Sequence, residues 1–473
     1  MRLVTLAACA WAFAALPAHA APPPAIAEAK AFEEEVLKHH AALVRLDTTN
    51  PPGNETRAVE YLKKVLDAEG IPSVIVGAQP ARMNLIARLK GTGSKKPILL
   101  MGHTDTVSID AKKWVNHGPF SADNDGTYIY GRGSTDDKDS VATYLTVLLT
   151  LKRQKVALDR DVIFFAEAAE EAGAGTVGAK WVLDNHGKEI EAEFCLAEGG
   201  GGRREKGKLL FTQIQTAEKM PRGATLIARG PAGHGSRPTP GNAVLALANA
   251  VTAAATWMPP MKLNDTTRAY FERLAAISPP GVAERYTNIL RADKAGEVQA
   301  WFKANDPAHY STVTTSITPT IIKAGYQFNV IPSEAEAMLD IRMLPDEDMD
   351  QFFEGLRKVI DNPNVEVVPR STALRPRTPP TGLDTPMFKA IESTHRELFG
   401  GIRVIPTMGV GATDMSYMRE TGMQCYGVGP AVDVEDTGLG YGAHSDQERV
   451  LVQGLRDFAR FAWGIVTTVA ARQ

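Results

Sequence analysis

A histidine and a carboxylate two positions apart, directly after an apolar run, give the first indication of chemistry in this chain. The run 97–101 reads Pro-Ile-Leu-Leu-Met, and His103 and Asp105 follow it. Side chains at positions i and i+2 of a strand lie on one face, so these two groups are able to act together. A carboxylate beside an imidazole is a common arrangement where the imidazole binds a metal ion.

Further acidic and imidazole side chains occur in similar settings, beside glycines or small residues at the ends of apolar runs. They are Asp136, Glu171, Glu198 and His444. Small neighbours let the backbone approach a bound group closely. Two zinc ions about 3.5–4 Å apart need a carboxylate between them. Together with His103, this carboxylate-rich set of five fits such a pair better than a single zinc site, and it predicts the metal centre of a two-zinc hydrolase.

Each of these residues also has an ordinary structural interpretation when taken singly. A histidine at a strand end can be structural, the pair Glu170–Glu171 can be solvated, and an aspartate in a glycine-rich turn can simply turn the chain. Residues 173–178 match the G-x-G-x-x-G pattern of dinucleotide-binding proteins. The carboxylates of Glu167, Glu170 and Glu171 precede that pattern and would repel a pyrophosphate, so the metal-centre interpretation is preferred.

Strands and helices are expected to alternate along the first part of the chain. Strands are expected near 72–77, 83–90, 97–103, 161–167 and 192–197, and helices near 26–46, 56–68, 137–154 and 177–186. This alternation predicts an α/β fold, a three-layer catalytic domain with a mixed, largely parallel sheet. The candidate ligands fall at the C-terminal ends of the strands, where such folds place their sites.

The pattern of alternating strands and helices changes near Pro221 and resumes after residues 375–380, which indicates a second domain inserted into the first. The insert is expected to be a smaller α+β lid or dimerisation domain. It includes a helical stretch, 257–312, whose aromatic side chains could line an acyl pocket, form the lid core or make a dimer contact. The expected boundaries are 1–20 for a signal peptide, 21–219 for the first part of the catalytic domain, 220–378 for the lid and 379–473 for the second part.

Composition excludes several classes of protein. The 473 residues are 44% hydrophobic and 23% charged, and the 52 basic and 55 acidic residues nearly balance, so no nucleic-acid partner is expected. Residues 1–20 combine Arg2, an apolar run and Ala18-His19-Ala20, which predicts a cleaved signal peptide and a periplasmic or secreted protein. After its removal, no apolar run is long enough for a membrane span.

Two cysteines remain outside the leader, Cys195 and Cys425, each inside an apolar run that is typical of a strand. A disulfide is an alternative in an exported protein. We expect two buried free thiols instead, because neither cysteine belongs to a recognisable framework.

A series of short motifs carries a resemblance to a known family. The motifs are His-x-Asp-x-Val at 103–107, Gly-Arg-Gly-x-x-Asp-x-Lys at 131–138, Glu-Glu at 170–171, Glu-Gly at 198–199, Gly-His-x-Ser-x-Pro at 233–238, Asn-Val-Ile-Pro at 329–332, Asp-Ile-Arg at 340–342 and Ala-His-Ser-x-x-Glu at 443–448. Over residues 30–465 the chain resembles the co-catalytic zinc aminoacylase/carboxypeptidase family, which includes glutamate carboxypeptidase, acetylornithine deacetylase and succinyl-diaminopimelate desuccinylase. It looks most like the exported carboxypeptidase/N-acyl-amino-acid hydrolase branch.

The resemblance implies a role for each matching residue. Asp136 would bridge two Zn²⁺ ions, for which Co²⁺ or Mn²⁺ could substitute. His103 and Glu198 would complete one metal site, and Glu171 and His444 the other.

The resemblance also implies the groups that act on the substrate. Glu170 would be the general base and then the acid, and Asp105 would orient His103. His234 and Asn329 would stabilise the oxyanion or hold substrate, and Arg342 would pair with a free carboxylate of the substrate.

Three positions depart from the family pattern: Ser108, Asp139 and Ala169. None of them removes a ligand or the base, so they affect only the placement within the family.

The expected function is hydrolysis of an amide bond in a small peptide or an N-acyl amino acid with a free carboxylate. The choice between these two substrates stays open at this stage. A homodimer through the lid is a further expectation, and in related enzymes the histidine that matches His234 can come from the second subunit. The alternative is a non-catalytic periplasmic binding protein on the same fold.

Overall fold

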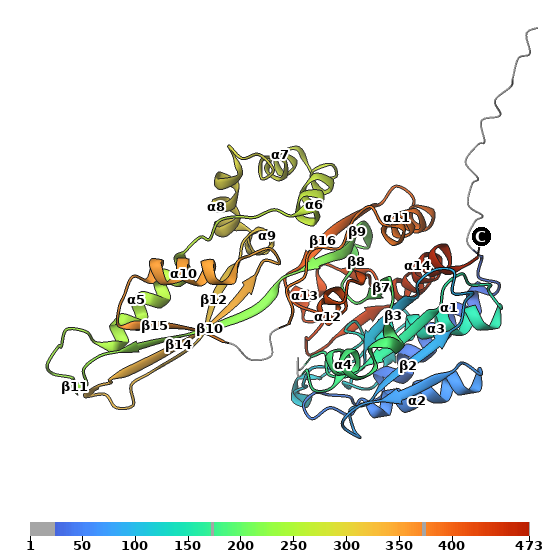
Figure 1. The fold of residues 1–473 in the computed structure, drawn as a ribbon, viewed down its shortest axis with the longest axis horizontal. Helices are drawn as coiled ribbons and strands as arrows, with labels where there is room; N and C mark the ends of the chain where they lie inside the picture. Colours follow the sequence, from blue (N-terminus) through green and yellow to red (C-terminus); the bar gives the residue numbers. More distant parts are fainter. Residues whose placement is uncertain (1–23, 172–174, 371–374, 473) are drawn as a thin grey trace, which may run out of the picture.

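The computed structural model describes residues 24–171, 175–370 and 375–472, which form an α/β domain and a smaller second domain (Figure 1). The expected signal peptide and part of the glycine-rich segment 173–178 lie outside the described residues. Within the described ranges, no helix is long and apolar enough to cross a membrane.

The α/β domain is built on a mixed sheet with the strand order β1-β2-β6-β3-β7-β17-β9-β8-β18, and β16 pairs with β9. Strands β6, β3, β7 and β17 are parallel neighbours, whereas β1, β2 and the β8–β9 hairpin pair antiparallel. The bounds are β1 (Ser73–Val76), β2 (Asn84–Leu89), β3 (Ile98–His103), β6 (Val162–Glu167), β7 (Phe194–Ala197), β8 (Gly200–Glu205), β9 (Lys208–Glu218), β16 (Arg403–Gly409), β17 (Gln424–Gly427) and β18 (Val432–Asp433).

Helices cover both faces of this sheet, because its central strands are apolar on both sides. Leu100 and Phe164 pack into a core with α1 (Ala29–Val44), α2 (Thr56–Ala68), α3 (Lys138–Arg153), α11 (Pro386–Phe399) and α14 (Val452–Ala470). The alternate residues Leu99 and Phe165 face α4 (Gly178–Ile190) and α12 (Met415–Glu420). This period of two in the buried strands produces the three-layer α/β fold that the sequence predicts.

The second domain is an antiparallel sheet with the order β12-β14-β10-β15 and two helices on one face. Its elements are β10 (Met220–Arg229), α5 (Ala243–Thr256), β12 (Ser316–Ala324), β14 (Glu334–Met343), α10 (Met349–Ile360) and β15 (Val365–Pro369). A short ladder of β11 (Gly233–His234) and β13 (Val330–Ile331) forms its distal tip (Figure 1). Strand β10 continues β9 with only Lys219 between them, so a nearly continuous strand joins the two domains.

The helical stretch within the insert comprises α6 (Asp265–Ala275), α7 (Pro280–Asn288), α8 (Ala295–Asn305) and α9 (Pro307–Val313). Phe271, Tyr286 and Phe302 are buried against one another and against Ile405 of β16. These aromatic residues form a hydrophobic core, and because that core includes Ile405 of the main sheet it is not confined to the lid.

Short elements complete the α/β domain. Strands β4 (Asp123–Asn124), β5 (Tyr128–Tyr130) and β19 (Arg449–Leu451) form a small sheet, with the helices η1 (Ala111–Lys113) and α13 (Asp436–Leu439) nearby in the sequence.

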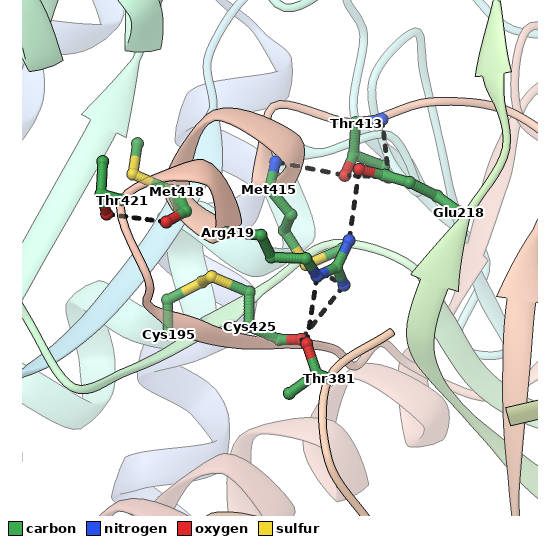
Figure 2. Close-up of a disulfide and its surroundings, with 9 residues drawn as sticks. All are labelled: Cys195, Glu218, Thr381, Thr413, Met415, Met418, Arg419, Thr421 and Cys425. Atoms are coloured by element: carbon green, nitrogen blue, oxygen red, sulfur yellow. Dashed lines mark hydrogen bonds and ion pairs between the residues drawn. A yellow bond between two sulfur atoms is a disulfide. The ribbon is translucent and has the colours of Figure 1, made fainter. Parts of the chain in front are cut away.

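The two cysteines form a disulfide, so the expectation of free thiols is wrong. Cys195 and Cys425 are directly opposite each other on the parallel neighbours β7 and β17, with their Cα atoms 4.4 Å apart. Both residues are fully buried. They are 230 positions apart in the chain, and only the order of the strands in the sheet brings them together. Figure 2 shows that the Cys425 carbonyl also accepts hydrogen bonds from Thr381 and Arg419.

Candidate metal centre

One carboxylate lies between two imidazoles. The Nε2 atom of His103 is 2.9 Å from Oδ1 of Asp136, and the Nε2 atom of His444 is 2.9 Å from Oδ2 of the same carboxylate. Each oxygen of Asp136 therefore faces a different histidine, which is the arrangement a bridging ligand between two metal ions needs.

The remaining predicted ligands surround this unit. Oε1 of Glu171 is 3.2 Å from Nε2 of His444, and Oε2 of Glu198 is 3.8 Å from Nε2 of His103. Ligand atoms of His103, Asp136 and Glu171 all lie within 4.8 Å of one another, as do those of His103, Glu170 and Glu198. All five predicted ligands and the predicted base thus meet at one place.

The main sheet brings four of these six residues together because they follow its parallel strands, whereas Asp136 and His444 come from loops outside it. His103 is the last residue of β3, Glu170 and Glu171 follow β6, and Glu198 follows β7. Ala169, which precedes the pair, has a φ of 64°, a conformation that non-glycine residues seldom adopt and that is concentrated at functional sites. The carboxyl ends of parallel strands share one edge of the sheet, where α/β proteins bind ligands.

Two distant motifs are held together by a buried ion pair. Arg132 contacts Glu448 at 2.6 Å, and the other oxygen of Glu448 accepts a hydrogen bond of 2.9 Å from the backbone N–H of Thr135. Arg132 also donates to the carbonyl of His444 at 3.3 Å. These contacts fix the loop that carries Asp136 against the loop that carries His444.

Asp105 lies beside His103, as the sequence predicts, but its carboxylate has a wider role. Nδ1 of His103 is 3.0 Å from the backbone carbonyl of Asp105 and 3.5 Å from its carboxylate. The carboxylate accepts hydrogen bonds from Asn50 and from the backbone N–H groups of Glu170 and Glu171, at 2.8, 3.1 and 3.3 Å. Asp105 therefore orients the Glu170–Glu171 turn as well as the histidine.

Arg375 is a site residue that the sequence analysis did not identify. It is 8% exposed, and it donates to Oε1 of Glu170 at 2.8 Å and to the carbonyl of Glu170 at 3.0 Å. It also contacts Asp414 at 3.1 Å. Arg375 comes from a proline-rich segment that was interpreted as a domain boundary, and no motif distinguishes it there.

A chain of hydrogen bonds and ion pairs extends from the Asp414 partner of this arginine to the disulfide-bonded strand. Thr413, next to Asp414, donates to Glu218 through its N–H and its hydroxyl, at 3.0 and 2.8 Å. Glu218 also pairs with Arg419 at 3.2 Å, and Arg419 donates to the carbonyl of Cys425 (Figure 2). The disulfide-bonded strand is thus connected to the neighbourhood of Glu170 through buried polar groups.

Burial and charge shift the pKa values of the site strongly. Burial raises the pKa of Glu170 to about 8; Asp414 and Glu171 add to the rise, and Arg375 opposes it. Burial likewise raises the pKa of Glu198 well above its usual range. The contacts with Asp136 and Glu171 raise the pKa of His444 to about 10. Such shifts are typical of functional sites that concentrate negative charge.

The predicted substrate-binding residues lie elsewhere, in the second domain. His234 is exposed and accepts a hydrogen bond from the Ser236 N–H at 3.1 Å, at the distal tip (Figure 1). Asn329 is exposed beside it, and its backbone carbonyl accepts a hydrogen bond from the Gly235 N–H at 2.7 Å. Arg342 is near the domain junction, paired with Asp340 at 2.9 Å. Among the described residues, none of the three contacts a predicted metal ligand.

The donor set fits divalent transition metals. It offers imidazole nitrogens and carboxylate oxygens, which suit zinc and its close neighbours such as Co²⁺ and Mn²⁺. The carboxylates lie close enough together that one cation alone would leave much of their charge uncompensated, so the set suits two ions better than one.

Comparisons with known proteins agree with this geometry. Residues 99–467 match the model of peptidase family M20/M25/M40. A probable carboxypeptidase S-like 2 of Dictyostelium discoideum is 27% identical over 82% of this chain and 74% of its own length. A probable succinyl-diaminopimelate desuccinylase of Staphylococcus aureus is 28% identical over 70% of this chain and 72% of its own length.

Solved structures show the same fold. An M20 family metallo-carboxypeptidase from Sulfolobus solfataricus has a TM-score of 0.68 at 18% identity and covers 92% of this chain and 99% of its own. The Bacillus subtilis YXEP protein, a dinuclear metal-binding M20 peptidase, has a TM-score of 0.60 at 15% identity and covers 93% and 98% of the two chains. The chain therefore belongs to peptidase family M20/M25/M40 and is a hydrolase of that family.

Proposed function

We propose that this protein uses two zinc ions to hydrolyse an amide bond in a small peptide or an N-acyl amino acid with a free carboxylate. The observation that carries the proposal is the position of Asp136, whose two oxygens each face a different histidine. His103 and Glu198 would hold one ion, and His444 and Glu171 the other.

The residues of the chain have distinct tasks in this reaction. When bound, the two ions supply Lewis acidity, which lowers the pKa of a water toward about 7 and polarises the scissile carbonyl. Glu170 accepts a proton from the attacking water and later delivers it to the nitrogen of the leaving amine. Arg375 holds one oxygen of Glu170, so the other oxygen is directed to the water. Asp105 keeps the backbone of Glu170 in place.

The substrate proposal has two supports. The matched relatives are named as a carboxypeptidase-like protein and a desuccinylase of an amino acid, and both names refer to amide bonds next to a carboxylate. Arg342 near the domain junction offers a guanidinium for that carboxylate. A non-catalytic binding protein is disfavoured, because Glu170 and all five ligand residues are present and converge.

Metal analysis with activity measurements tests the function. The purified protein is expected to contain about two transition-metal ions per chain. Chelation should abolish hydrolysis of N-acyl amino acids and dipeptides, and Zn²⁺ should restore it, with Co²⁺ and Mn²⁺ as comparisons. Full activity in a metal-free preparation would refute the proposal.

We further propose a homodimer through the second domain. Strand β12 is the edge of its sheet, and the segment that it begins exposes Ile321, Ile322, Tyr326 and Phe328, the last two by 82% and more. An exposed apolar edge strand is a template for pairing with a second chain. His234 is close to this segment in the fold, because it pairs with Val330. In this dimer, His234 reaches the metal centre of the partner subunit.

Complementation tests this arrangement. Glu170→Gln and His234→Ala proteins, each inactive alone, should regain some activity after mixing, because a hybrid dimer contains one intact site. No recovery, when subunit exchange has been demonstrated independently, would contradict the role of His234 across the dimer.

Export is also part of the proposal. It rests on residues 1–20 as a signal peptide and is supported by the buried disulfide, since disulfides persist in oxidising compartments. N-terminal sequencing of the natural protein should find Ala21 as its first residue, and an intact leader in cytoplasmic protein would refute export.

A further inference from the structure

A cavity of about 430 Å³ opens directly beside the metal centre. Its lining includes Thr135, Gly200 and Ala443, which are one or two positions from the predicted ligands Asp136, Glu198 and His444. Its volume is within the range of small-molecule sites. A substrate whose amide lies at the metal centre can therefore extend one of its ends into this cavity.

The β8–β9 hairpin forms one wall of the cavity and gives it a distinct chemistry. Side chains alternate between the faces of a strand, so Arg203, Phe211 and Gln213 line this cavity, whereas the next residue, Arg204, lines a separate cavity on the opposite face. At about 3.3 Å per residue, the Cα of Arg203 lies about 10 Å along β8 from that of Gly200. The Arg203 side chain reaches from there to Gln213, which is the register partner of Gly201, so its guanidinium lies within the cavity, a short distance from the loops of the predicted metal ligands.

Arg203 is the unbalanced charge of this cavity. Its Nε donates to Oε1 of Gln213 at 2.6 Å, which leaves the two terminal NH₂ groups. In the described part of the chain, no carboxylate lies within 4 Å of its guanidinium. Burial lowers the pKa of Arg203, as expected where no acid compensates the charge.

The acidic groups in the same cavity already have partners. Asp433 accepts a hydrogen bond from Tyr128 at 2.6 Å and lies 3.5 Å from Arg204. Asp436 is paired with Arg449 at 2.7 Å. The opposite charges within each pair cancel, so the cavity retains the positive charge of Arg203.

The rest of the lining suits an aliphatic chain. Leu210, Phe211, Val432 and Val434 contribute apolar surface to the cavity wall. Leu210 and Val434 are 42% and 43% exposed, so their apolar surface is accessible to a ligand in the cavity.

We propose that this cavity binds the acyl part of the substrate and that Arg203 recognises a second carboxylate at the end of that acyl group. The preferred substrates are then amides of a dicarboxylic acid, such as N-succinyl or N-glutaryl amino acids. The two free NH₂ groups of Arg203 hold the terminal carboxylate in a bidentate contact. This inference rests on the proposed amide hydrolysis and names the substrate class within it.

Matched substrate pairs test the role of Arg203. N-succinyl-L-alanine and N-butanoyl-L-alanine differ only in a terminal carboxylate against a methyl group, as do the N-glutaryl and N-pentanoyl derivatives. The wild type should have a kcat/KM at least about 10-fold higher for the dicarboxylic member of at least one pair. Arg203→Met should remove that preference by lowering kcat/KM on the diacid about 10- to 100-fold, with the methyl-terminated substrate nearly unaffected.

Two further variants control for charge and folding. Lys208→Met removes a positive charge from the same hairpin at an exposed position that does not line the cavity, and should leave the preference intact. Arg203→Lys keeps the charge without the bidentate contact and should retain part of the preference. The proposal for Arg203 is wrong, and the proposed hydrolysis stands, in either of two cases. The wild type has no preference in either pair, or Arg203→Met lowers kcat/KM equally for both substrates of a pair.

Equilibrium binding separates this inference from the proposed hydrolysis. If the wild type cleaves neither these four substrates nor any dipeptide, the proposed function fails. Calorimetry with the monoamides of succinic and glutaric acid decides on Arg203 whether or not the four substrates are cleaved. Binding of a monoamide to the wild type and to Lys208→Met, but not to Arg203→Met, would support the carboxylate site. Equal binding to all three, or binding to none, would overturn it.

Discussion

The metal centre and the predicted substrate-binding residues are built in opposite ways. In the α/β domain, His103, Asp136 and His444 are already in contact, and buried groups fix the loops that carry them. In the second domain, His234 is exposed at a distal tip and Arg342 is paired with its neighbour Asp340. The reacting groups are preassembled, whereas the recognition groups are held apart from them.

This difference follows from the parts that connect the residues. Three of the predicted ligands, His103, Glu171 and Glu198, follow adjacent strands of one sheet, whose hydrogen bonds fix their relative positions. The buried Arg132–Glu448 pair fixes the loops of the other two. The substrate-binding residues belong to another sheet, which is joined to the first through Lys219 between β9 and β10 and through the segment that contains Arg375. The predicted metal-binding geometry is therefore built within the α/β domain, whereas His234 and Arg342 contact none of the predicted ligands in the described arrangement.

The largest expected effect comes from the preassembled region. Glu170→Gln keeps the shape of the side chain but removes the proton acceptor, so kcat should fall at least about 100-fold while both metal ions are retained. Glu171→Gln should instead lose one ion. Kinetics combined with elemental analysis separates the two variants, and identical behaviour would contradict the division of roles within this pair.

A smaller effect is expected from the recognition region. Arg342→Ala should lower kcat/KM about 30-fold, equivalent to about 2 kcal/mol, because the carboxylate of the substrate loses its partner. A substrate with an amidated C-terminus should be cleaved poorly by the wild type, and the mutation should not lower its kcat/KM further. If the mutation lowers kcat/KM for the amidated substrate as much as for the acid, Arg342 does not bind the carboxylate.

A still smaller effect on catalysis is expected from Arg375, which comes from a segment that joins the two domains and contacts Glu170. Arg375→Met removes the hydrogen bond that orients Glu170, and we expect kcat to fall about 10-fold with KM and metal content nearly unchanged. Arg377→Met is a matched control from the same segment, since Arg377 contacts the carbonyl of Glu347 in the second domain. A change confined to KM would show that Arg375 acts on substrate binding and not on the base.

The smallest effect concerns stability at the junction. Burial, with a contribution from Arg342, lowers the pKa of Lys219 to about 7 from 10.5. Between these two pH values the unfolded chain binds more protons than the folded protein, so stability should rise with pH, by at most about 1.4 kcal/mol per pH unit. Below pH 7 this contribution should be constant.

Urea unfolding at pH 7, 8 and 9 measures this effect. The midpoint for the wild type should increase relative to that of Lys219→Met over this range, because the variant lacks the titrating amine. Parallel pH profiles would mean that Lys219 stays charged at the junction, held by its hydrogen bonds to Ser311, Thr314 and Ser316.

The sequence by itself determined the elements and the list of candidate ligands. Apolar periodicity predicted the main strands and helices within a few residues, since each of these segments carries its own pattern of burial; β3 is observed at 98–103 against 97–103 expected. The five candidate ligands are predicted from residue types that recur beside small residues at the ends of apolar runs, and Glu170 as the base is implied by the resemblance of the motifs to a known family. Asp105 was found from its spacing to His103.

Only the tertiary structure decided which distant residues meet. The disulfide depends on β7 and β17 being neighbours in register, although their cysteines are 230 positions apart. The contact of Arg375 with Glu170 joins residues 205 positions apart. The role proposed for Arg203 depends on its position on one face of a hairpin and on the absence of an acidic partner among the described residues. Local patterns encode burial and chemistry, but strand order and the pairing of charges depend on the packing of the whole chain.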